Sequence, residues 1–258
     1  MTSPLRIPDL DQKVFLVTGA STGIGAAVAR ALAAQGASVA VHYNASQEGA
    51  RDVAASIDAV GGKSFLVGGD VSVRSGCEAV VAKAAEHFGR IDGLINNAGS
   101  LLGRVPTIES DEEHDRAVMD LNAHSVVWAS RAAHPWLRRN GGVIINTTSI
   151  AARNGGGGGA VLYAAAKGFV STFTRGFAKE VVADNIRVNA VSPGVILTPF
   201  HERYSSEAQM AGMVATVPMG RAGTVEDCVG AYLFLASNAL SGYVTGQILE
   251  VNGGQLMP

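Results

Sequence analysis

The sequence has only two cysteines, Cys77 and Cys228, which lie far apart in the chain and form no C-x-x-C pair. Cysteine therefore indicates neither a metal site nor a disulfide framework, and this usage is typical of a protein of the reducing cytoplasm. The six histidines also stand alone, without ligand spacing such as H-E-x-x-H. We expect them at surface or core positions, with no bound metal and a cytoplasmic location.

Charge is scarce as well, because 16% of the 258 residues are charged and the formal net charge is −2. No cluster of Lys and Arg relieves this balance, which argues against a nucleic-acid partner. Residues 1–12 contain Pro4, Pro8 and several charges but no long apolar run. They predict a loose lead-in rather than a signal peptide or a spanning helix, so we expect no membrane partner.

Hydrophobic residues make up 47% of the chain, enough for a large core in one α/β domain or in two small ones. No linker-like run divides residues 13–258, which favours one domain. The segment 13–36 organises it: an apolar run at 14–17 predicts a buried strand, and an alanine-rich stretch at 26–35 predicts a helix that ends at Gly36.

Gly19, Gly23 and Gly25 lie between this strand and this helix. A glycine turn at that place lets the backbone approach a diphosphate, and the free N–H groups of the first helical turn attract its charge. A tight corner without a ligand is the alternative, and the spacing differs from the common G-x-G-x-x-G. We favour nucleotide binding.

Strand and helix patterns continue to alternate along the chain. Further strands are predicted at 38–41, 64–67, 91–95, 143–146 and 247–251, and further helices at 48–60, 74–88, 110–137, 163–182 and 225–237. This order predicts an α/β fold, a single-domain Rossmann-type doubly wound parallel sheet with helices on both faces. Ligands of such sheets bind at the carboxyl ends of the strands.

The end of the second strand bears on the choice of coenzyme. An acidic residue there would bind the ribose 2′-hydroxyl and repel a 2′-phosphate, and residues 41–47 contain none. Tyr43 and Asn44 therefore favour NADP(H). NAD(H) stays possible, because no Arg is present to clamp the phosphate.

Three other segments allow two interpretations each. Residues 96–99, Asn-Asn-Ala-Gly, either pack against a cofactor or form an Asx turn. Asn122 is a poor helix former inside the expected helix 110–137, and on propensity alone it faces solvent harmlessly. Residues 155–159 are five glycines, which form either a surface insertion or a pliable edge to a substrate pocket.

Tyr163 and Lys167 stand four residues apart, so on a helix they share one face. A neighbouring cation favours the phenolate and lowers the pKa of the phenol from about 10, which suits proton transfer near neutrality. Ser149, at a strand end one loop away, adds a hydroxyl that can hold a substrate oxygen. Alone, Tyr-x-x-x-Lys is a weak motif.

The motifs together resemble those of the short-chain dehydrogenase/reductase family, and in particular its branch of 3-oxoacyl-[acyl-carrier-protein] reductases. The resemblance runs from about residue 13 to 254. It rests on Thr18-Gly-x-x-x-Gly-Ile-Gly25, Asp70-Val71, Asn96-Asn-Ala-Gly99, Asn122, Ser149, Tyr163-x-x-x-Lys167 and Ser192-Pro193-Gly194 before Thr198. Each motif is weak alone, and chance does not account for all of them in this order.

The resemblance implies four catalytic residues. Tyr163 would protonate the carbonyl oxygen, Ser149 would hydrogen-bond it, and Lys167 would lower the pKa of Tyr163 and bind the nicotinamide ribose. Asn122 would position a water of the proton relay, which replaces its harmless interpretation. With Tyr43 and Asn44, the expected cofactor contacts are Gly19, Ser21, Thr22, Gly23, Ile24, Gly25, Asp70, Val71, Asn97, Ala98, Gly99, Tyr163, Lys167, Pro193, Gly194, Val195, Ile196 and Thr198.

Two departures from the family pattern concern the pocket. Thr147-Thr148-Ser149 replaces the commoner serine pair, so Thr148 could share the role of Ser149. The glycine run lengthens the loop before Tyr163 by about one residue relative to the family. By the same resemblance, residues of about 195–224 form the substrate-loop region, and the protein is a homotetramer built through its long middle helices and its C-terminal strand.

The expected function is that of an NAD(P)-dependent oxidoreductase with a small-molecule substrate. We favour NADPH-dependent reduction of a ketone or 3-oxoacyl thioester to the secondary alcohol, with Tyr163 as proton donor. The alternative is an NAD-dependent dehydrogenase that oxidises a secondary alcohol, a sugar or a steroid. A third possibility is a non-catalytic dinucleotide-binding regulator, against which the presence of all four catalytic residues argues.

Overall fold

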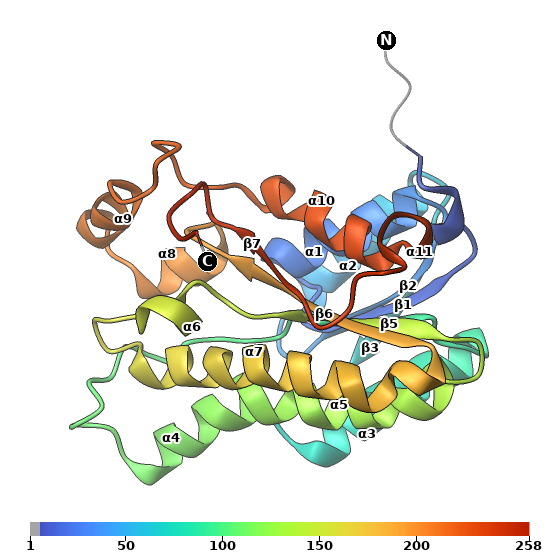
Figure 1. Ribbon diagram of the computed structural model, residues 1–258, viewed down its shortest axis with the longest axis horizontal. Coiled ribbons are helices and arrows are strands. Elements are labelled where there is room, and N and C mark those ends of the chain that lie inside the picture. Colours follow the sequence, from blue (N-terminus) through green and yellow to red (C-terminus); the bar gives the residue numbers. More distant parts are fainter. Residues whose placement is uncertain (1–5, 258) are drawn as a thin grey trace.

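A parallel sheet of seven strands forms the centre of the computed structural model, which describes residues 6–257 (Figure 1). The strands are β1 (Val14–Val17), β2 (Ser38–Tyr43), β3 (Lys63–Gly68), β4 (Gly93–Asn96), β5 (Gly142–Thr147), β6 (Ile186–Pro193) and β7 (Ile248–Val251). Their order in the sheet is β3-β2-β1-β4-β5-β6-β7, and all neighbours are parallel. The predicted doubly wound fold is confirmed.

Helices cover both faces of this sheet (Figure 1). One face carries α1 (Gly23–Ala34), α2 (Gln47–Asp58), α10 (Val225–Ala236) and α11 (Asn238–Ser241), and the other carries α3 (Arg74–Phe88), α4 (Glu112–Met119), α5 (Ser125–Leu137) and α7 (Val161–Val181). Three short helices, α6 (Ala151–Asn154), α8 (Pro199–Tyr204) and α9 (Glu207–Val214), lie near the carboxyl ends of the strands. Single turns, η1 (Pro8–Leu10), η2 (Asp120–His124) and η3 (Val182–Asp184), complete the chain.

Each face of the sheet has its own hydrophobic core. All four residues of β1 are buried, and successive side chains point to opposite faces. Phe15 and Val17 pack with Leu32 of α1, whereas Leu16 packs with Leu137 of α5. Burial on both faces explains why the strands read as continuous apolar runs in the sequence.

Two elements differ from the sequence-based expectation. No strand was expected at β6, although its residues 186–191 pair with β5. The helix expected over 110–137 is present over 112–137, but it is not a regular α-helix: α4 passes at Met119 into the π turn η2, and α5 begins at Ser125. At this turn the Asn122 side chain donates to two backbone carbonyls, and that of Ser100 lies outside the helix.

Residues 6–12 are anchored, although they fall in the expected loose lead-in. Ile7 and Leu10 are buried against the α1 face of the core. The Asp9 carboxylate accepts hydrogen bonds from Ser237 Oγ at 2.7 Å and Ala239 N at 2.9 Å. Residues 1–5 of the lead-in lie outside the described residues.

No helix within residues 6–257 has both the length and the apolar character that crossing a bilayer requires.

Candidate active site

The glycine turn between β1 and α1 forms a cradle that side chains would fill. Gly19 and Gly23 have φ values of +62° and +57°, which favour glycine. A Cβ at Gly19 would lie 2.9 Å from Ala98 Cα, and one at Gly25 would lie 2.4 Å from Gly19 O. Thr22, the N-cap of α1, makes no side-chain capping bond. The first N–H groups of α1 therefore suit a diphosphate.

Neighbouring strands hold this turn in place. Thr18 Oγ1 accepts from the backbone N–H groups of Asn97 and Ala98 at 2.9 and 3.1 Å. The Asn97 amide donates to Thr18 O and Gly19 O, both at 3.1 Å. On the other side, His42 Nδ1 accepts from Gly19 N at 3.0 Å. Asn97 thus serves the turn rather than an Asx motif alone.

His42 was expected only as a core or surface residue, and no signal in the sequence connects it with the turn. Its side chain is 1% exposed, and burial lowers its pKa, which keeps the ring neutral. A neutral ring with Nδ1 as acceptor donates through Nε2, and Gly69 O lies 2.9 Å from that atom. His42 therefore joins the glycine turn to the end of β3.

A cavity of about 570 Å³ runs along the carboxyl ends of the strands from this turn to α7. The predicted residues that line it are Gly19, Ser21, Thr22, Gly23, Ile24, Asn44, Val71, Asn97, Ala98, Gly99, Ser149, Tyr163, Lys167, Pro193, Gly194, Val195, Ile196 and Thr198. Residues from distant parts of the chain meet here, as expected for a parallel sheet.

Four predicted residues do not line this cavity. Gly25 lies behind the turn, against Gly19 O. The Tyr43 ring covers Gly68, where a Cβ would approach its Cζ to 2.9 Å. Asp70 lines a second cavity that shares Asn44 with the first. Asn122 is completely buried.

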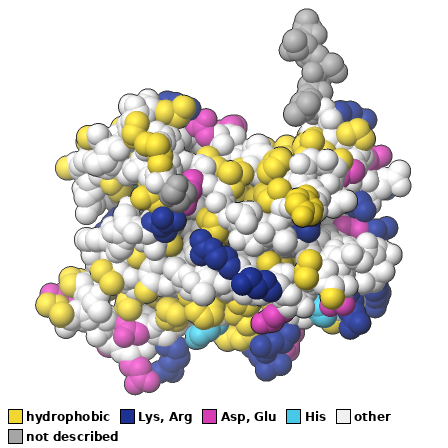
Figure 2. Space-filling model, in the orientation of Figure 1, with side chains coloured by type: hydrophobic (Ala, Val, Ile, Leu, Met, Phe, Trp, Pro, Cys, Tyr) yellow, Lys and Arg dark blue, Asp and Glu magenta, His cyan; other side chains and the backbone are white. Residues whose placement is uncertain are grey.

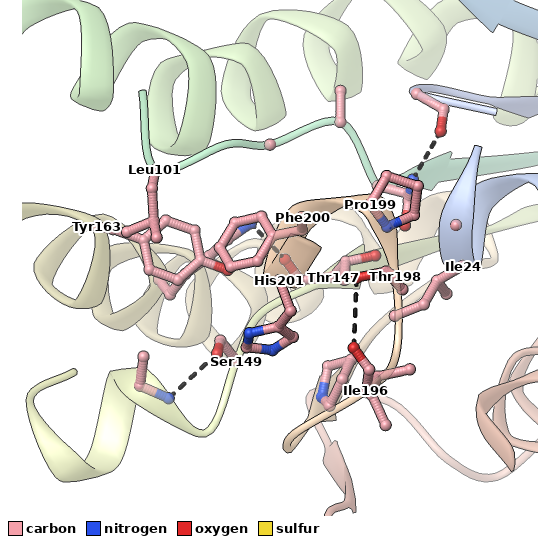
Figure 3. A pocket seen from close by; sticks show the side chains of 18 of the residues that line it. Ile24, Leu101, Thr147, Ser149, Tyr163, Ile196, Thr198, Pro199, Phe200 and His201 are labelled. Atoms are coloured by element: carbon pink, nitrogen blue, oxygen red, sulfur yellow. Dashed lines mark hydrogen bonds between the residues drawn. The ribbon is translucent and has the colours of Figure 1, made fainter. Parts of the chain in front are cut away.

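Tyr163, Ser149 and Lys167 all line this cavity. Figure 3 shows Tyr163 and Ser149 near one another in its wall. Tyr163 and Lys167 lie in the first two turns of α7, and Ser149 follows β5. Lys167 Nζ donates to Thr147 O at 2.9 Å and lies 5.6 Å from the centroid of the Tyr163 ring. The expected approach of cation and phenol is present, with the ammonium anchored on β5.

Burial sets the pKa values of both groups. It raises the pKa of the Tyr163 phenol to about 12, against which the hydrogen bond with Ser149 acts. It lowers the pKa of Lys167 to about 8. The expected lowering of the phenol pKa is therefore absent in the folded chain, because removal from water has the largest effect on it.

Asn122 lies behind Gly99 at the centre of the π turn. Its Oδ1 accepts from Ser100 N at 3.0 Å, and its Nδ2 donates to Ser100 O at 2.8 Å and Val118 O at 2.9 Å. A Cβ at Gly99 would lie 2.8 Å from Asn122 Oδ1 and 3.2 Å from Lys167 Nζ. Glycine at position 99 thus allows these two side chains to converge.

Thr148, which was considered as a partner of Ser149 in the motif Thr147-Thr148-Ser149, makes its hydrogen bonds away from Tyr163. Its Oγ1 donates to Lys167 O at 2.8 Å and lies 2.8 Å from Ser171 Oγ. Thr148 therefore joins β5 to α7. Ser149 is the hydroxyl that interacts with Tyr163.

Five further residues line the cavity that were not predicted individually, although those of α8 fall in the expected substrate-loop region of about 195–224. They are Leu101 and Arg104 from the loop after β4, and Phe200, His201 and Arg203 from α8. The centroids of the Phe200 and Tyr163 rings lie 5.6 Å apart (Figure 3). These positions follow no helix or strand periodicity in the sequence. The aromatic residue after Pro199 is the one feature of the sequence that could have indicated a pocket there.

The glycine run borders the same cavity through Gly156. All five residues have positive φ, from +52° to +82°. Arg104 Nη1 donates to Gly158 O at 3.0 Å, and Val105 N donates to Gly159 O at 3.1 Å. Of the two interpretations, the edge of a pocket agrees with this position.

Comparison with known proteins agrees with the geometry. The family model adh_short_C2, described as Enoyl-(Acyl carrier protein) reductase, matches residues 19–255. A 3-oxoacyl-[acyl-carrier-protein] reductase of Synechocystis sp. is 39% identical over 252 residues, which cover 96% of this chain and 98% of the relative.

Two solved structures are similar throughout. The NADH-dependent reductase A1-R′ responsible for alginate metabolism has a TM-score of 0.90 at 38% identity, covering 97% of this chain and all of that one. A 7α-hydroxysteroid dehydrogenase, complexed with NADH and 7-oxo glycochenodeoxycholic acid, has a TM-score of 0.91 at 34% identity and 96% coverage of both chains. The protein is an NAD(P)-binding oxidoreductase with a small-molecule substrate, and it belongs to the short-chain dehydrogenase/reductase family.

Proposed function

We propose that the protein is an NAD(P)H-dependent reductase that converts a ketone or a 3-oxoacyl thioester to the secondary alcohol. The observation that carries this proposal is the convergence of Ser149, Tyr163 and Lys167 at one end of a cavity whose other end is the glycine cradle. A neutral phenol with a pKa of about 12 is fully protonated at neutral pH and can serve as proton donor.

Each of the four residues has a proposed task. Tyr163 gives its phenolic proton to the carbonyl oxygen, and Ser149 hydrogen-bonds that oxygen. Lys167 holds the nicotinamide ribose and favours the phenolate once it forms. Asn122 positions a water that returns a proton to the site. The bound nicotinamide supplies the hydride, and the chain supplies position and the proton path.

The proposed cofactor contacts follow from the cavity wall. Gly19, Ser21, Thr22, Gly23 and Ile24 would hold the diphosphate, and the segment from Pro193 to Thr198 would lie at the nicotinamide. Gly25 and Asn97 would support the turn, and Asp70 and Val71 would border adenine. Tyr43 does not line the cavity, and it keeps a proposed role only because it precedes Asn44, which does.

Replacement of the phenol tests the proposal. Tyr163→Phe should lower kcat by about 10²-fold to 10⁴-fold, while the dissociation constant of NADPH stays within about twofold, because the ring remains. Tyr243→Phe is the matched control, since Tyr243 is fully exposed. Turnover is measured from nicotinamide absorbance with a panel of ketones and 3-oxoacyl thioesters. Unchanged turnover by Tyr163→Phe would remove Tyr163 as proton donor.

NADP(H) is the proposed coenzyme, with NAD(H) as the alternative. Support comes from Asn44, Ala45 and Ser46, which line the cavity after β2 and are uncharged, so that no carboxylate repels a 2′-phosphate there. The similarity to an NADH-dependent reductase supports the alternative. Titration calorimetry should give NADPH at least about tenfold tighter binding, or about 1.4 kcal/mol; tighter NADH would favour the alternative.

A second candidate is the oxidation of a secondary alcohol, sugar or steroid with NAD. The similarity to the 7α-hydroxysteroid dehydrogenase supports it, and the same residues would act in reverse, with Tyr163 accepting the alcohol proton. Coenzyme preference separates the two candidates. The third expectation, a regulator without catalysis, would be supported only if the Tyr163 test found no turnover in the unsubstituted protein.

Further proposals concern the whole chain. We propose that residues 13–258 act as one domain in which about 195–224 form the substrate loop, a region that contains α8 and α9. A homotetramer is proposed from the family resemblance and from the exposed aromatic side chain of Phe169 on α7. Two buried free cysteines support the proposed cytoplasmic location.

A further inference from the structure

The Tyr163 end of the cavity is lined by basic side chains and by no acidic one. Besides Lys167, the wall contains Arg104 and Arg203, and none of its lining residues within the described chain is Asp or Glu. His201 also lines the wall, but burial and the charge of Arg104 lower its pKa, which favours the neutral ring. Glu202 lies on α8 between His201 and Arg203 but is not part of the wall. This end therefore presents positive charge to whatever the cavity holds.

Arg104 makes its hydrogen bonds only with neutral acceptors. Its Nε donates to Tyr204 O, its Nη1 to Gly158 O at 3.0 Å, and its Nη2 to Ser205 Oγ at 3.3 Å. These bonds join the glycine run to α8 but leave the charge of a half-buried guanidinium without a counter-ion. A guanidinium whose hydrogen bonds all go to neutral acceptors still attracts an anion.

Arg203, which is exposed to solvent, is likewise without a carboxylate. Within residues 6–257, no ion pair shorter than 4.0 Å involves Arg104 or Arg203. The Arg203 guanidinium lies 5.9 Å from the centroid of the Tyr204 ring. Two guanidinium groups thus border one cavity without an ion-pair partner. Guanidinium groups bind carboxylates through two parallel hydrogen bonds.

Ring side chains of α8, the helix that carries Arg203, lie beside Tyr163. The Phe200 ring centroid is 5.6 Å from that of Tyr163 and 5.4 Å from that of His201. In Figure 3, Phe200 and His201 lie beside Tyr163, and Ile24 of the first turn of α1 lies across the view. The helix that carries Arg203 therefore borders the position proposed for the substrate carbonyl.

We propose that the substrate is the anion of an oxo acid, whose carboxylate is bound by Arg104 and Arg203 while its carbonyl oxygen meets Ser149 and Tyr163. His201 adds a hydrogen-bonding group beside this carboxylate. The proposal rests on the proposed function and narrows its substrate class. It favours a free oxo acid over a thioester, because the acid group of a thioester is esterified and uncharged.

Binding to the protein loaded with oxidised coenzyme tests the proposal apart from turnover, because a carbonyl compound cannot be reduced there. The probes are 2-oxobutanoate, 3-oxobutanoate and 4-oxopentanoate, each compared with its methyl ester by calorimetry at low salt. At least one acid should bind about tenfold tighter than its ester, as expected for a charge-assisted pair. No acid binding, or equal binding of every acid and ester, would overturn the proposal.

Substitution of the two arginines tests whether they cause the tighter binding of the acid. Arg203→Gln and Arg104→Gln should each reduce the acid-to-ester affinity ratio by at least about threefold. Arg153→Gln is the control for net charge, because Arg153 is exposed on α6 and outside the cavity wall. An acid-to-ester ratio that survives both substitutions would also contradict the proposal.

Turnover with reduced coenzyme separates the two proposals. Tighter binding of an acid without its reduction would contradict the reductase function and leave the recognition of the anion standing. Equal reduction of acids and esters would contradict the recognition of the anion and leave the reductase function standing.

Discussion

Tyr163 and Lys167 show how burial acts on the two groups of one site in opposite directions. It raises the pKa of the phenol to about 12 and lowers that of the ammonium to about 8, so that the ammonium is still mostly protonated at pH 7. A donor phenol beside a cation is thus the state of the folded chain at neutral pH. The lysine matters after proton donation, when its charge lies beside a phenolate in a site of low polarity.

Removal of Lys167 should change how stability depends on pH. Between about pH 8 and 10.5 the unfolded chain keeps the Lys167 proton while the folded chain has lost it, so this group makes stability rise with pH. The difference in free energy of unfolding, wild type minus Lys167→Met, should therefore increase by roughly 1 to 3 kcal/mol from pH 7.5 to pH 10. Urea unfolding at four pH values measures it.

The difference also isolates Lys167 from the cysteines. Burial raises the pKa values of Cys77 and Cys228 to about 12, so they make stability fall over the same pH range, but equally in both proteins. Lys179→Met, an exposed lysine of the same helix, is the control. A pH-independent difference for Lys167→Met would show that the ammonium is not desolvated.

The sequence predicts those residues whose role is determined by a short motif of neighbouring residues. Gly19 and Gly99 are placed by their motifs, and the structure shows the close approaches that require them. His42 and Arg104 act through contacts with Gly69 and Tyr204, which lie far along the chain. Spacing in the sequence holds no information about such contacts.

At the scale of elements, the prediction is right for helices whose boundaries are set by residues of the same segment. α3 begins and ends as predicted, because Gly89 adopts the left-handed conformation that stops it. The π turn after α4 depends instead on Ser100, a partner outside the helix. β6 carries Asn189 among apolar residues, and its amide donates to Val244 O at 2.9 Å, so a buried polar side chain interrupted the pattern of a strand.

The glycine run offers a test at this scale. Gly159→Ala should destabilise the protein more than Gly157→Ala, and lower kcat/KM, because the edge of the cavity must shift. Both positions have positive φ, +76° and +67°, which costs an alanine about 1 kcal/mol. Only at Gly159 would the new Cβ also meet backbone, Arg104 C at 2.8 Å and Val105 N at 2.9 Å; Gly157 has nothing within 4 Å.

Urea unfolding and kcat/KM of the two variants measure this effect, and Gly157→Ala is the matched control for backbone strain. Equal loss of stability in both variants would mean that the loop yields at Gly159 and that its contact with residues 104 and 105 does not hold it. In that case the run would behave as a surface insertion.

At the scale of the molecule, an aromatic surface on α7 stands out from a surface that is otherwise mixed. Phe169, Phe173 and Phe177 follow one another at intervals of four residues, with ring centroids 6.3 and 5.0 Å apart. Phe169 is 39% exposed, and His124 of the neighbouring π turn packs against it. Figure 2 shows hydrophobic side chains over the region of α5 and α7, bordered by Lys and Arg.

This surface is where the proposed tetramer would bury apolar area, since exposed apolar patches mark interaction sites. Phe173→Glu places a charge at the centre of the aromatic row and should shift the protein to a smaller assembly in sedimentation velocity, with its circular dichroism spectrum retained. Val60→Glu, at an apolar residue 69% exposed beyond the end of α2, is the control and should not change the assembly. If Phe173→Glu sediments as the unsubstituted protein does, the long middle helices do not form the interface, and β7, whose Leu249 is 37% exposed, becomes the surface to test.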